Sequence, residues 1–170
     1  MLGYVDECRI MNHMKIYIAR GKGIGTTELG AFDAALNDSG IANFNLIRLS
    51  SVIPPSTEVV EVDRIPEIDG EWGDRLYVVQ AHYETSIVGG VAAAGVGWVI
   101  DETGKGLFVE HEGDSEEYVK TSIEKTLSDL VKTRQADFGK IYMMVETAEC
   151  KKEGEPVAAM VTAVYKAESW

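Results

Sequence analysis

Cysteine is scarce in this chain, which has two cysteines among its 170 residues. Cys8 and Cys150 lie far apart in the sequence and form no C-x-x-C motif, so no disulfide framework or thiolate metal site is indicated. A single disulfide between them is conceivable, but buried or idle thiols in a cytosolic protein are the favoured interpretation. We therefore expect a cytoplasmic protein.

Histidine is nearly as rare. His13, His82 and His111 fall on separate predicted strands, and no two of them have the i, i+4 spacing of ligands on one helix face. The local sequences A-H-Y-E and E-H-E are not metal-binding spacings by themselves. We expect no metal cofactor. The chain also lacks the G-x-S-x-G elbow, which weakens the interpretation as an ordinary serine hydrolase.

Basic residues are outnumbered by acidic ones. There are 16 Lys and Arg against 28 Asp and Glu, for a formal net charge of -12. Such a surface repels phosphate backbones and anionic membranes, so we expect neither a nucleic-acid partner nor a membrane partner. A cationic small molecule would be attracted, although a charge excess of this kind usually reflects no more than solubility.

No apolar run is long enough to span a membrane. The longest candidate, residues 87–100, has 14 residues and contains four glycines, whereas a membrane helix needs about 18 or more. We interpret this run as a buried strand. The first 15 residues carry acids early and lack a continuous apolar segment, so they do not have the pattern of a signal peptide.

A glycine-rich segment, G-K-G-I-G at residues 21–25, invites comparison with a phosphate-binding loop. It has neither the G-x-x-x-x-G-K-[ST] spacing nor the third glycine of a dinucleotide motif. We interpret it as the turn between a strand at residues 14–20 and a helix capped by Thr26 or Thr27. The helix places Leu29, Phe32 and Leu36 on one face and ends at Gly40.

The remaining elements are mostly strands. A second helix, over residues 115–135, is predicted to begin with a capping box formed by Asp114 and Glu117. Residues 56–75 are acidic and are expected to be a surface excursion. Further strands are predicted at residues 42–49, 75–82, 85–100, 106–112, 140–147 and 156–166. The first of these is apolar on both faces, as in a strand covered on both sides. Two helices and about six strands in this order predict an α+β layered sandwich in a single domain spanning residues 1–170.

The sequence N-L-I-R-L-S-S-V-I-P-P-S, residues 45–56, ends a predicted strand with two adjacent serines and a rigid Pro54-Pro55 turn. A serine hydroxyl beside a rigidly held peptide bond can attack the preceding carbonyl and convert the amide into an ester. A Ser-Ser pair alone is very weak evidence for such a reaction, and most such pairs only end a strand.

Residues 31–60 closely resemble the pyruvoyl-dependent arginine decarboxylases around their self-cleavage site, most sharply in N-x-N-L-I-R-x-S-S-x-x-P-P. The resemblance continues through G-L-F-V-E-H-E-G at residues 106–113, the helix at 115–135 and A-A-M-V-T-A-V-Y-K at 158–166. The family resemblance implies a four-layer αββα sandwich that assembles into homotrimers or larger sets of trimers, with active sites at subunit boundaries.

The resemblance further implies that the chain is a zymogen. Ser51 would attack the Ser50 carbonyl, and autocatalytic serinolysis would yield a β chain of residues 1–50 and an α chain of residues 51–170. Ser51 would become a covalent pyruvoyl group, whose ketone condenses with the substrate α-amine and accepts electrons as CO₂ leaves. The implied reaction converts L-arginine to agmatine, which would serve polyamine synthesis or acid resistance.

The resemblance also assigns site residues. Glu110 would deliver a proton to the substrate α-carbon, and burial on an apolar strand would favour its protonated form. The alternative is that it only caps a strand edge. Asp33 would bind the substrate guanidinium beside Leu36, or instead pair within the subunit, for example with Arg48. Ser50 would also contact substrate.

Asn45 has two open interpretations. It would orient the Ser50 carbonyl or the substrate carboxylate, or it is a buried amide that satisfies a strand end. At the level of the whole chain, alternatives are a pyruvoyl decarboxylase for another amino acid and an unprocessed, non-catalytic trimer that binds a ligand.

Overall fold

The computed structural model describes residues 13–170, so Cys8 and the segment 1–12 lie outside the described residues. Two helices and nine strands follow in the order β1 (Met14–Ile24), α1 (Glu28–Ser39), β2 (Asn45–Arg48), β3 (Val52–Ile53), β4 (Thr57–Glu61), β5 (Arg75–Thr85), β6 (Val91–Ile100), β7 (Gly106–Gly113), α2 (Glu116–Arg134), β8 (Tyr142–Glu149) and β9 (Val157–Glu168).

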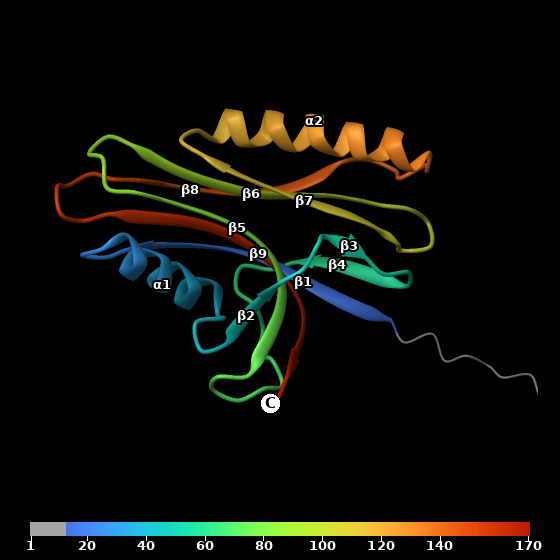
Figure 1. Cartoon of the computed structure of the whole chain (residues 1–170), viewed down its shortest axis with the longest axis horizontal. Coiled ribbons are helices and arrows are strands. Elements are labelled where there is room, and N and C mark those ends of the chain that lie inside the picture. Colours follow the sequence, from blue (N-terminus) through green and yellow to red (C-terminus); the bar gives the residue numbers. More distant parts are fainter. Residues whose placement is uncertain (1–12) are drawn as a thin grey trace, which may run out of the picture.

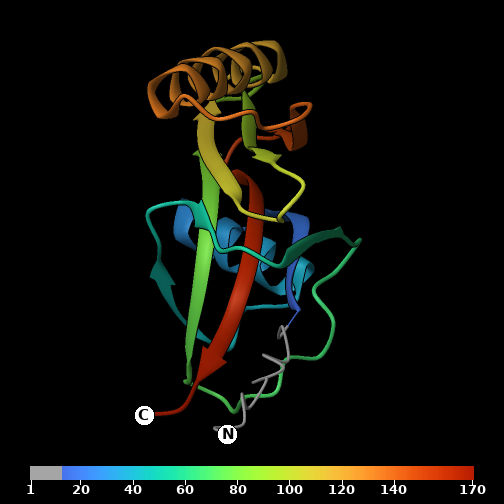
Figure 2. The same cartoon turned by 90° about the vertical axis from the view of Figure 1, so that its right-hand side faces the viewer.

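The elements form four layers. Five strands form one sheet in the order β2-β5-β9-β1-β4, and four form a second in the order β3-β7-β6-β8. Figure 1 shows the two sheets stacked between α1, which covers the outer face of the five-stranded sheet, and α2, which covers the outer face of the four-stranded one. In the turned view of Figure 2, α2 lies at the top and β5 and β9 run down in front of α1. The predicted α+β sandwich with αββα layers is confirmed.

The main core lies between the sheets. Ile16, Ile18 and Val161 of the five-stranded sheet pack there against Val96 and Phe108 of the four-stranded sheet, all almost fully buried. Along a strand successive side chains point to opposite faces, so residues 107 and 109 turn toward α2 while 108 and 110 turn toward the other sheet. This alternation decides which side chains can reach the interior of the sandwich.

The glycine-rich segment is a strand and not the predicted turn. Gly21 and Gly23 continue β1, which ends at Ile24, and α1 packs directly over them. A Cβ at Gly23 would lie 2.2 Å from the Ala31 carbonyl oxygen, and one at Gly21 would lie 2.3 Å from that of Ala35. The glycines are therefore explained by the close approach of a helix to a strand.

Two strand predictions also need correction. β2 lies at an edge of the five-stranded sheet, where β5 is its one partner among residues 13–170. Asn45 and Arg48 are exposed and the two residues between them are only partly buried, so the predicted coverage on both faces is wrong. The acidic segment after Ser56 is not entirely a surface excursion, since Thr57–Glu61 forms β4 and pairs in parallel with β1.

Both helices begin at a residue whose side chain caps the first turn. Thr27 Oγ1 accepts a hydrogen bond from the Gly30 backbone N–H at 3.0 Å, and Gly40 ends α1 in the left-handed conformation, as predicted. The second helix begins one residue later than expected. Its cap is Ser115, whose Oγ accepts from the Tyr118 N–H, and not Asp114.

The segment considered for a membrane span forms β6 from Val91 onward, with Ala92 to Val99 buried. Among residues 13–170, no helix is both long and apolar enough to cross a bilayer.

Candidate active site

Ser50 and Ser51 lie where the chain crosses from one sheet to the other. β2 belongs to the five-stranded sheet and β3 to the four-stranded sheet, and the two serines occupy the short connection between them. Ser50 is exposed, whereas Ser51 is partly buried. Ser51 has a φ of 67°, the left-handed region that a non-glycine residue enters at a cost of roughly 1–2 kcal/mol. The backbone is thus held in an unfavourable conformation at the predicted cleavage site.

The Ser51 hydroxyl faces a carboxylate. Ser51 Oγ donates a hydrogen bond to Glu110 Oε1 at 2.6 Å. Glu110 lies on β7 opposite Val96 of β6 and is only partly buried. A carboxylate in this position can take the proton of the hydroxyl.

The two carbonyls after the Ser50–Ser51 bond are also held. The Phe108 backbone N–H donates to the Ser51 carbonyl oxygen at 2.8 Å, and the Tyr165 hydroxyl donates to the Val52 carbonyl oxygen at 3.0 Å. Burial, and then the charge of Glu110, raises the pKa of Tyr165 well above its usual value. Sequence reasoning did not single out Tyr165, because a side chain that bonds a backbone carbonyl across two sheets leaves no local pattern.

Asp33 and Leu36 do not join Ser51 within one chain. Both lie on α1, where Leu36 packs on the outer face of the five-stranded sheet, whereas Ser51 bonds Glu110 on the inner side of the sandwich. Asp33 is exposed and makes no ion pair with any other residue from 13 to 170. The suggested pairing with Arg48 is not formed, because the Arg48 guanidinium donates to Gln80 Oε1 at 3.2 Å.

Asn45 is likewise apart from the serines. Its side-chain nitrogen donates to the Gly73 carbonyl oxygen at 2.5 Å, so it satisfies a loop next to the start of β2. The side chain is exposed, which contradicts the interpretation as a buried amide. In the intact chain, among the described residues, no hydrogen bond joins it to Ser50 or Ser51.

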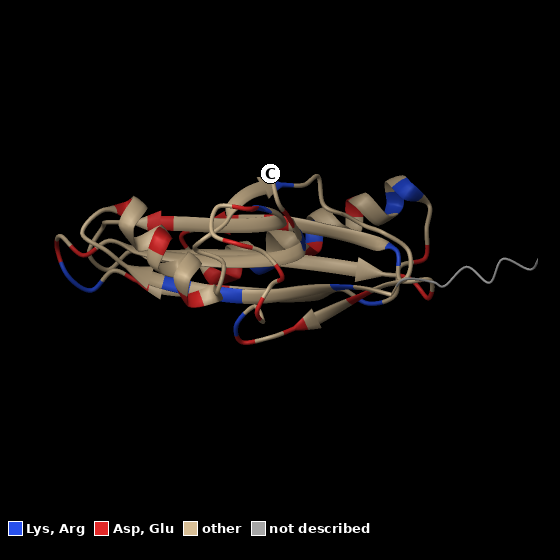
Figure 3. Cartoon of the chain, turned by 90° about the horizontal axis from the view of Figure 1, so that it is seen from below, with Lys and Arg blue, Asp and Glu red and all other residues tan. Residues whose placement is uncertain are grey.

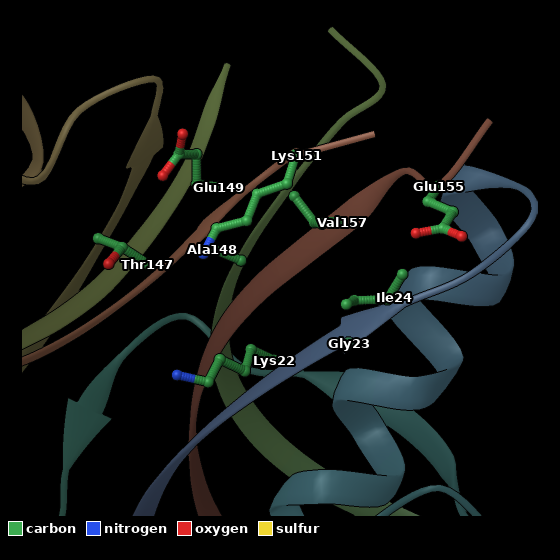
Figure 4. A pocket seen from close by; sticks show the side chains of 9 residues that line it. All are labelled: Lys22, Gly23, Ile24, Thr147, Ala148, Glu149, Lys151, Glu155 and Val157. Atoms are coloured by element: carbon green, nitrogen blue, oxygen red, sulfur yellow. The ribbon is translucent and has the colours of Figure 1, made fainter. Parts of the chain in front are cut away.

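A surface pocket of about 460 Å³ lies elsewhere, at the hairpin between β8 and β9. Figure 4 shows Lys22 and Lys151 beside Glu149 and Glu155 around it, a mixture of charges of both signs. Neither Ser51 nor Glu110 lines this pocket. Within residues 13–170 no group of three or more His, Cys, Asp or Glu side chains is arranged to hold a metal ion.

Comparison with known proteins decides the family. A sequence model of the pyruvoyl-dependent arginine decarboxylases matches residues 15–169. The chain belongs to this family. The pyruvoyl-dependent arginine decarboxylase of Halobacterium salinarum is 36% identical over 152 residues, which cover 89% of this chain and 93% of that relative.

More distant family members agree. The pyruvoyl-dependent arginine decarboxylase of Methanocaldococcus jannaschii is 32% identical over 119 residues, 69% of this chain and 67% of that relative. The pyruvoyl-dependent arginine decarboxylase 2 of Archaeoglobus fulgidus is 27% identical over 150 residues, 86% of this chain and 94% of that relative. The family predicted from the sequence is confirmed.

The residues at the sheet crossover fit the group that gives the family its name. A pyruvoyl group made from the chain itself requires a serine whose hydroxyl can leave as part of an ester, and Ser51 supplies it. The group would remain attached to Val52 through a carbonyl that already accepts a hydrogen bond from the Phe108 N–H. The family therefore implies a covalent cofactor that this chain has the residues to form.

Proposed function

We propose that this chain is a proenzyme that cleaves itself between Ser50 and Ser51 and then decarboxylates L-arginine to agmatine and CO₂. The observation that carries the proposal is the contact of the Ser51 hydroxyl with Glu110 at 2.6 Å, beside a left-handed backbone, in a chain of this family. Cleavage would give residues 1–50 and residues 51–170. We place the enzyme in the cytoplasm, where the buried Cys150, which forms no disulfide within residues 13–170, would stay reduced.

Self-cleavage begins from the hydrogen bond between Ser51 and Glu110. Glu110 takes the proton of Ser51 Oγ as this oxygen bonds to the Ser50 carbonyl carbon. The amide C–N bond then breaks, and the proton passes from Glu110 to the leaving nitrogen, which gives an ester and a free amine. Loss of the Ser51 Cα proton then breaks the Cβ–O bond, which frees the Ser50 carboxylate and leaves dehydroalanine. Addition of one water releases one ammonia and leaves the pyruvoyl terminus.

Glu110 serves again in the decarboxylation. The pyruvoyl group supplies a ketone that accepts electrons as the substrate loses CO₂, the role of an organic electron sink. Glu110 stays on β7 beside residue 51 and, in its protonated form, donates a proton to the substrate α-carbon in place of the lost CO₂. One carboxyl group would therefore act as a base in cleavage and as an acid in turnover.

Asp33 is proposed to bind the substrate guanidinium, with Leu36 beside its alkyl chain. Helix α1 carries Glu28 in its first turn and no basic residue in its last. Figure 3 shows acidic residues on α1 and on many of the loops, which would attract a cationic substrate. An exposed carboxylate that makes no ion pair within residues 13–170 can form two hydrogen bonds to a guanidinium.

The separation of Asp33 from Ser51 supports a site shared between subunits. Asp33 lies on the outer face of the five-stranded sheet and the Ser51–Glu110 pair on its inner side, so one chain cannot bring both to one arginine. We propose that a homotrimer or larger assembly of trimers places α1 of one subunit, and with it Asp33, over the crossover of its neighbour. Asn45 is proposed to act with Ser50 near the substrate carboxylate in the same assembly.

Mixed assemblies test this arrangement. Asp33→Asn should cleave normally but raise the KM for arginine by about 10- to 100-fold, the loss expected for a hydrogen bond between charged groups. Ser51→Ala should neither cleave nor turn over arginine. Co-expression of these two variants should restore activity, because some boundaries then pair an intact Asp33 with a processed residue 51.

The matched control co-expresses wild-type chains with a double variant that carries both Asp33→Asn and Ser51→Ala. A separate variant, Glu28→Gln, controls for the loss of another acid from α1. Mixed assemblies that show only the raised KM of Asp33→Asn would contradict a shared site. An Asp33→Asn chain that loses cleavage and substrate binding equally would contradict the recognition role.

A further inference from the structure

Tyr165 connects the two sheets at the cleavage site. It belongs to β9 in the five-stranded sheet, and its hydroxyl donates to the Val52 carbonyl oxygen of β3 in the four-stranded sheet at 3.0 Å. β3 has two residues and lies at the sheet edge, paired only with β7 through Val52 and Ile53. A strand this short needs further contacts to stay in place.

The ring of Tyr165 is fixed as well as its hydroxyl. It packs edge-on against Phe108, with 6.3 Å between ring centroids and 66° between ring planes. Phe108 is itself buried and uses its backbone N–H to hold the Ser51 carbonyl. Tyr165 and Phe108 therefore hold two successive carbonyls, those of Val52 and Ser51, and touch each other.

The other side of the Ser50–Ser51 bond is anchored too. The Leu49 backbone N–H donates to the Val78 carbonyl oxygen of β5 at 2.9 Å, which holds this residue on the five-stranded sheet. The chain from Leu49 to Val52 thus spans from one sheet to the other, and Ser51 takes up the change of direction with its positive φ. The conformation of Ser51 depends on how closely the two sheets are held here.

We infer that Tyr165 is a positioning residue for self-cleavage: by holding the Val52 carbonyl it keeps Ser51 in the left-handed conformation that directs its hydroxyl at Glu110. The inference rests on the proposed self-cleavage. Tyr165 takes no part in bond making or breaking. Without its hydroxyl, β3 and the crossover gain freedom, and the Ser51 hydroxyl spends less time beside its base and the Ser50 carbonyl.

The test measures the rate of chain cleavage directly. Full-length chains are made by cell-free translation with a short pulse of labelled amino acid, and the intact fraction is followed on denaturing gels. Tyr165→Phe should cleave about five- to tenfold more slowly than the parent, the effect of losing one hydrogen bond from the reactive conformation. Tyr77→Phe should cleave at the parental rate, since the hydroxyl bond that it loses, to Glu168, involves no residue from 49 to 52.

A second control separates positioning from general loss of stability. Thr27→Ala removes the cap of α1, which should lower the melting temperature at least as much as Tyr165→Phe does. Melting temperatures are recorded in the Ser51→Ala background, where every chain stays intact. Thr27→Ala should leave the cleavage rate at the parental value.

Two results would overturn this inference and leave the proposed function standing. One is an equal cleavage rate for Tyr165→Phe and the parent, and the other is that Thr27→Ala slows cleavage as much as Tyr165→Phe does. A parent chain that does not cleave would overturn the proposed function, and this inference with it. Slow cleavage in Tyr165→Phe only, with parental rates in both controls, supports the positioning role.

Discussion

At the scale of single residues, the site is a strained serine that its neighbours hold in place. The positive φ of Ser51 costs roughly 1–2 kcal/mol, and each of the hydrogen bonds at Ser51 Oγ, the Ser51 carbonyl and the Val52 carbonyl offsets about 1 kcal/mol. Together these hydrogen bonds hold Ser51 in a left-handed conformation that it would otherwise leave. The strain is located beside the bond that is proposed to break.

Replacing Glu110 by glutamine should slow self-cleavage about 100-fold, because the amide keeps the hydrogen-bonding shape but cannot accept the Ser51 proton. Glu112→Gln is the matched control, since Glu112 lies on the same strand but is exposed. The rate is read from the intact fraction on denaturing gels after pulse labelling. If both variants cleave at the parental rate, Glu110 is not the base.

The raised pKa of Tyr165 predicts a loss of stability in alkali. An unfolded tyrosine loses its proton near pH 10, whereas the folded Tyr165 keeps it, so unfolding above this pH releases a proton. The free energy of unfolding should then fall as pH rises, by at most about 1.4 kcal/mol per pH unit from this group.

Urea unfolding at pH 8 and pH 10.5 checks this in the Ser51→Ala background, with Tyr165→Phe and the exposed Tyr118→Phe compared. Tyr165→Phe should lose less stability in alkali than the parent, and Tyr118→Phe should behave like the parent. An identical loss in Tyr165→Phe and the parent would show that Tyr165 does not keep its proton.

At the scale of elements, glycine decides where helices can lie. Gly95 and Gly97 on β6 face α2, and a Cβ at Gly97 would lie 2.1 Å from Ile123 Cγ2. Gly21 and Gly23 on β1 likewise face α1, and a Cβ at either position would collide with that helix. Both sets occur in glycine-rich strands, and the close approach of a helix explains them without any ligand.

Gly97→Ala should therefore destabilise the fold by about 1–3 kcal/mol, the usual cost of overpacking a core. Gly139→Ala is a suitable control, because its added Cβ would find its nearest neighbour, the Ile100 carbonyl oxygen, at 3.4 Å. Chemical denaturation in the Ser51→Ala background measures both. A Gly97→Ala chain as stable as the control would mean that α2 shifts outward at no cost.

Sequence patterns predicted the elements that have strong signals of their own. The helix after Thr27 and the long strand β9 were found from their caps and apolar periodicity. β3 and β4 were missed, because a two-residue edge strand and an acidic strand have no such pattern and depend on their partners β7 and β1. The glycines of β1 were misinterpreted, since the sequence alone does not show that a helix lies over them.

The candidate site was predicted only in part, for a similar reason. The resemblance brought Ser51 and Glu110 together, and they are in contact. Tyr165 was missed because its role depends on the distance between two sheets. The helical position of Asp33 predicts which face of α1 carries it. It does not predict which sheet α1 covers, so the placement of Asp33 outside the sandwich could not be predicted.

At the scale of the whole molecule, the sandwich separates two halves of the proposed chemistry. The inner side holds the serine, its base and the tyrosine, while the outer helix carries the acid for a cationic substrate. The connection from β2 to β3 contains the bond that is proposed to break and joins the five-stranded sheet to the four-stranded sheet. Cutting the chain there would leave β1, α1 and β2 bound to the rest through the pairing of β1 with β4 and β9 and of β2 with β5.

The most direct test of self-cleavage is the intact mass of freshly purified protein under denaturing conditions, with Ser51→Ala purified in parallel. Self-cleavage predicts two masses for the parent, those of residues 1–50 and 51–170, with the larger fragment lighter by one ammonia than a serine terminus would make it. Ser51→Ala should give one full-length mass. A single full-length mass for the parent would contradict self-cleavage and favour an unprocessed protein that binds a ligand.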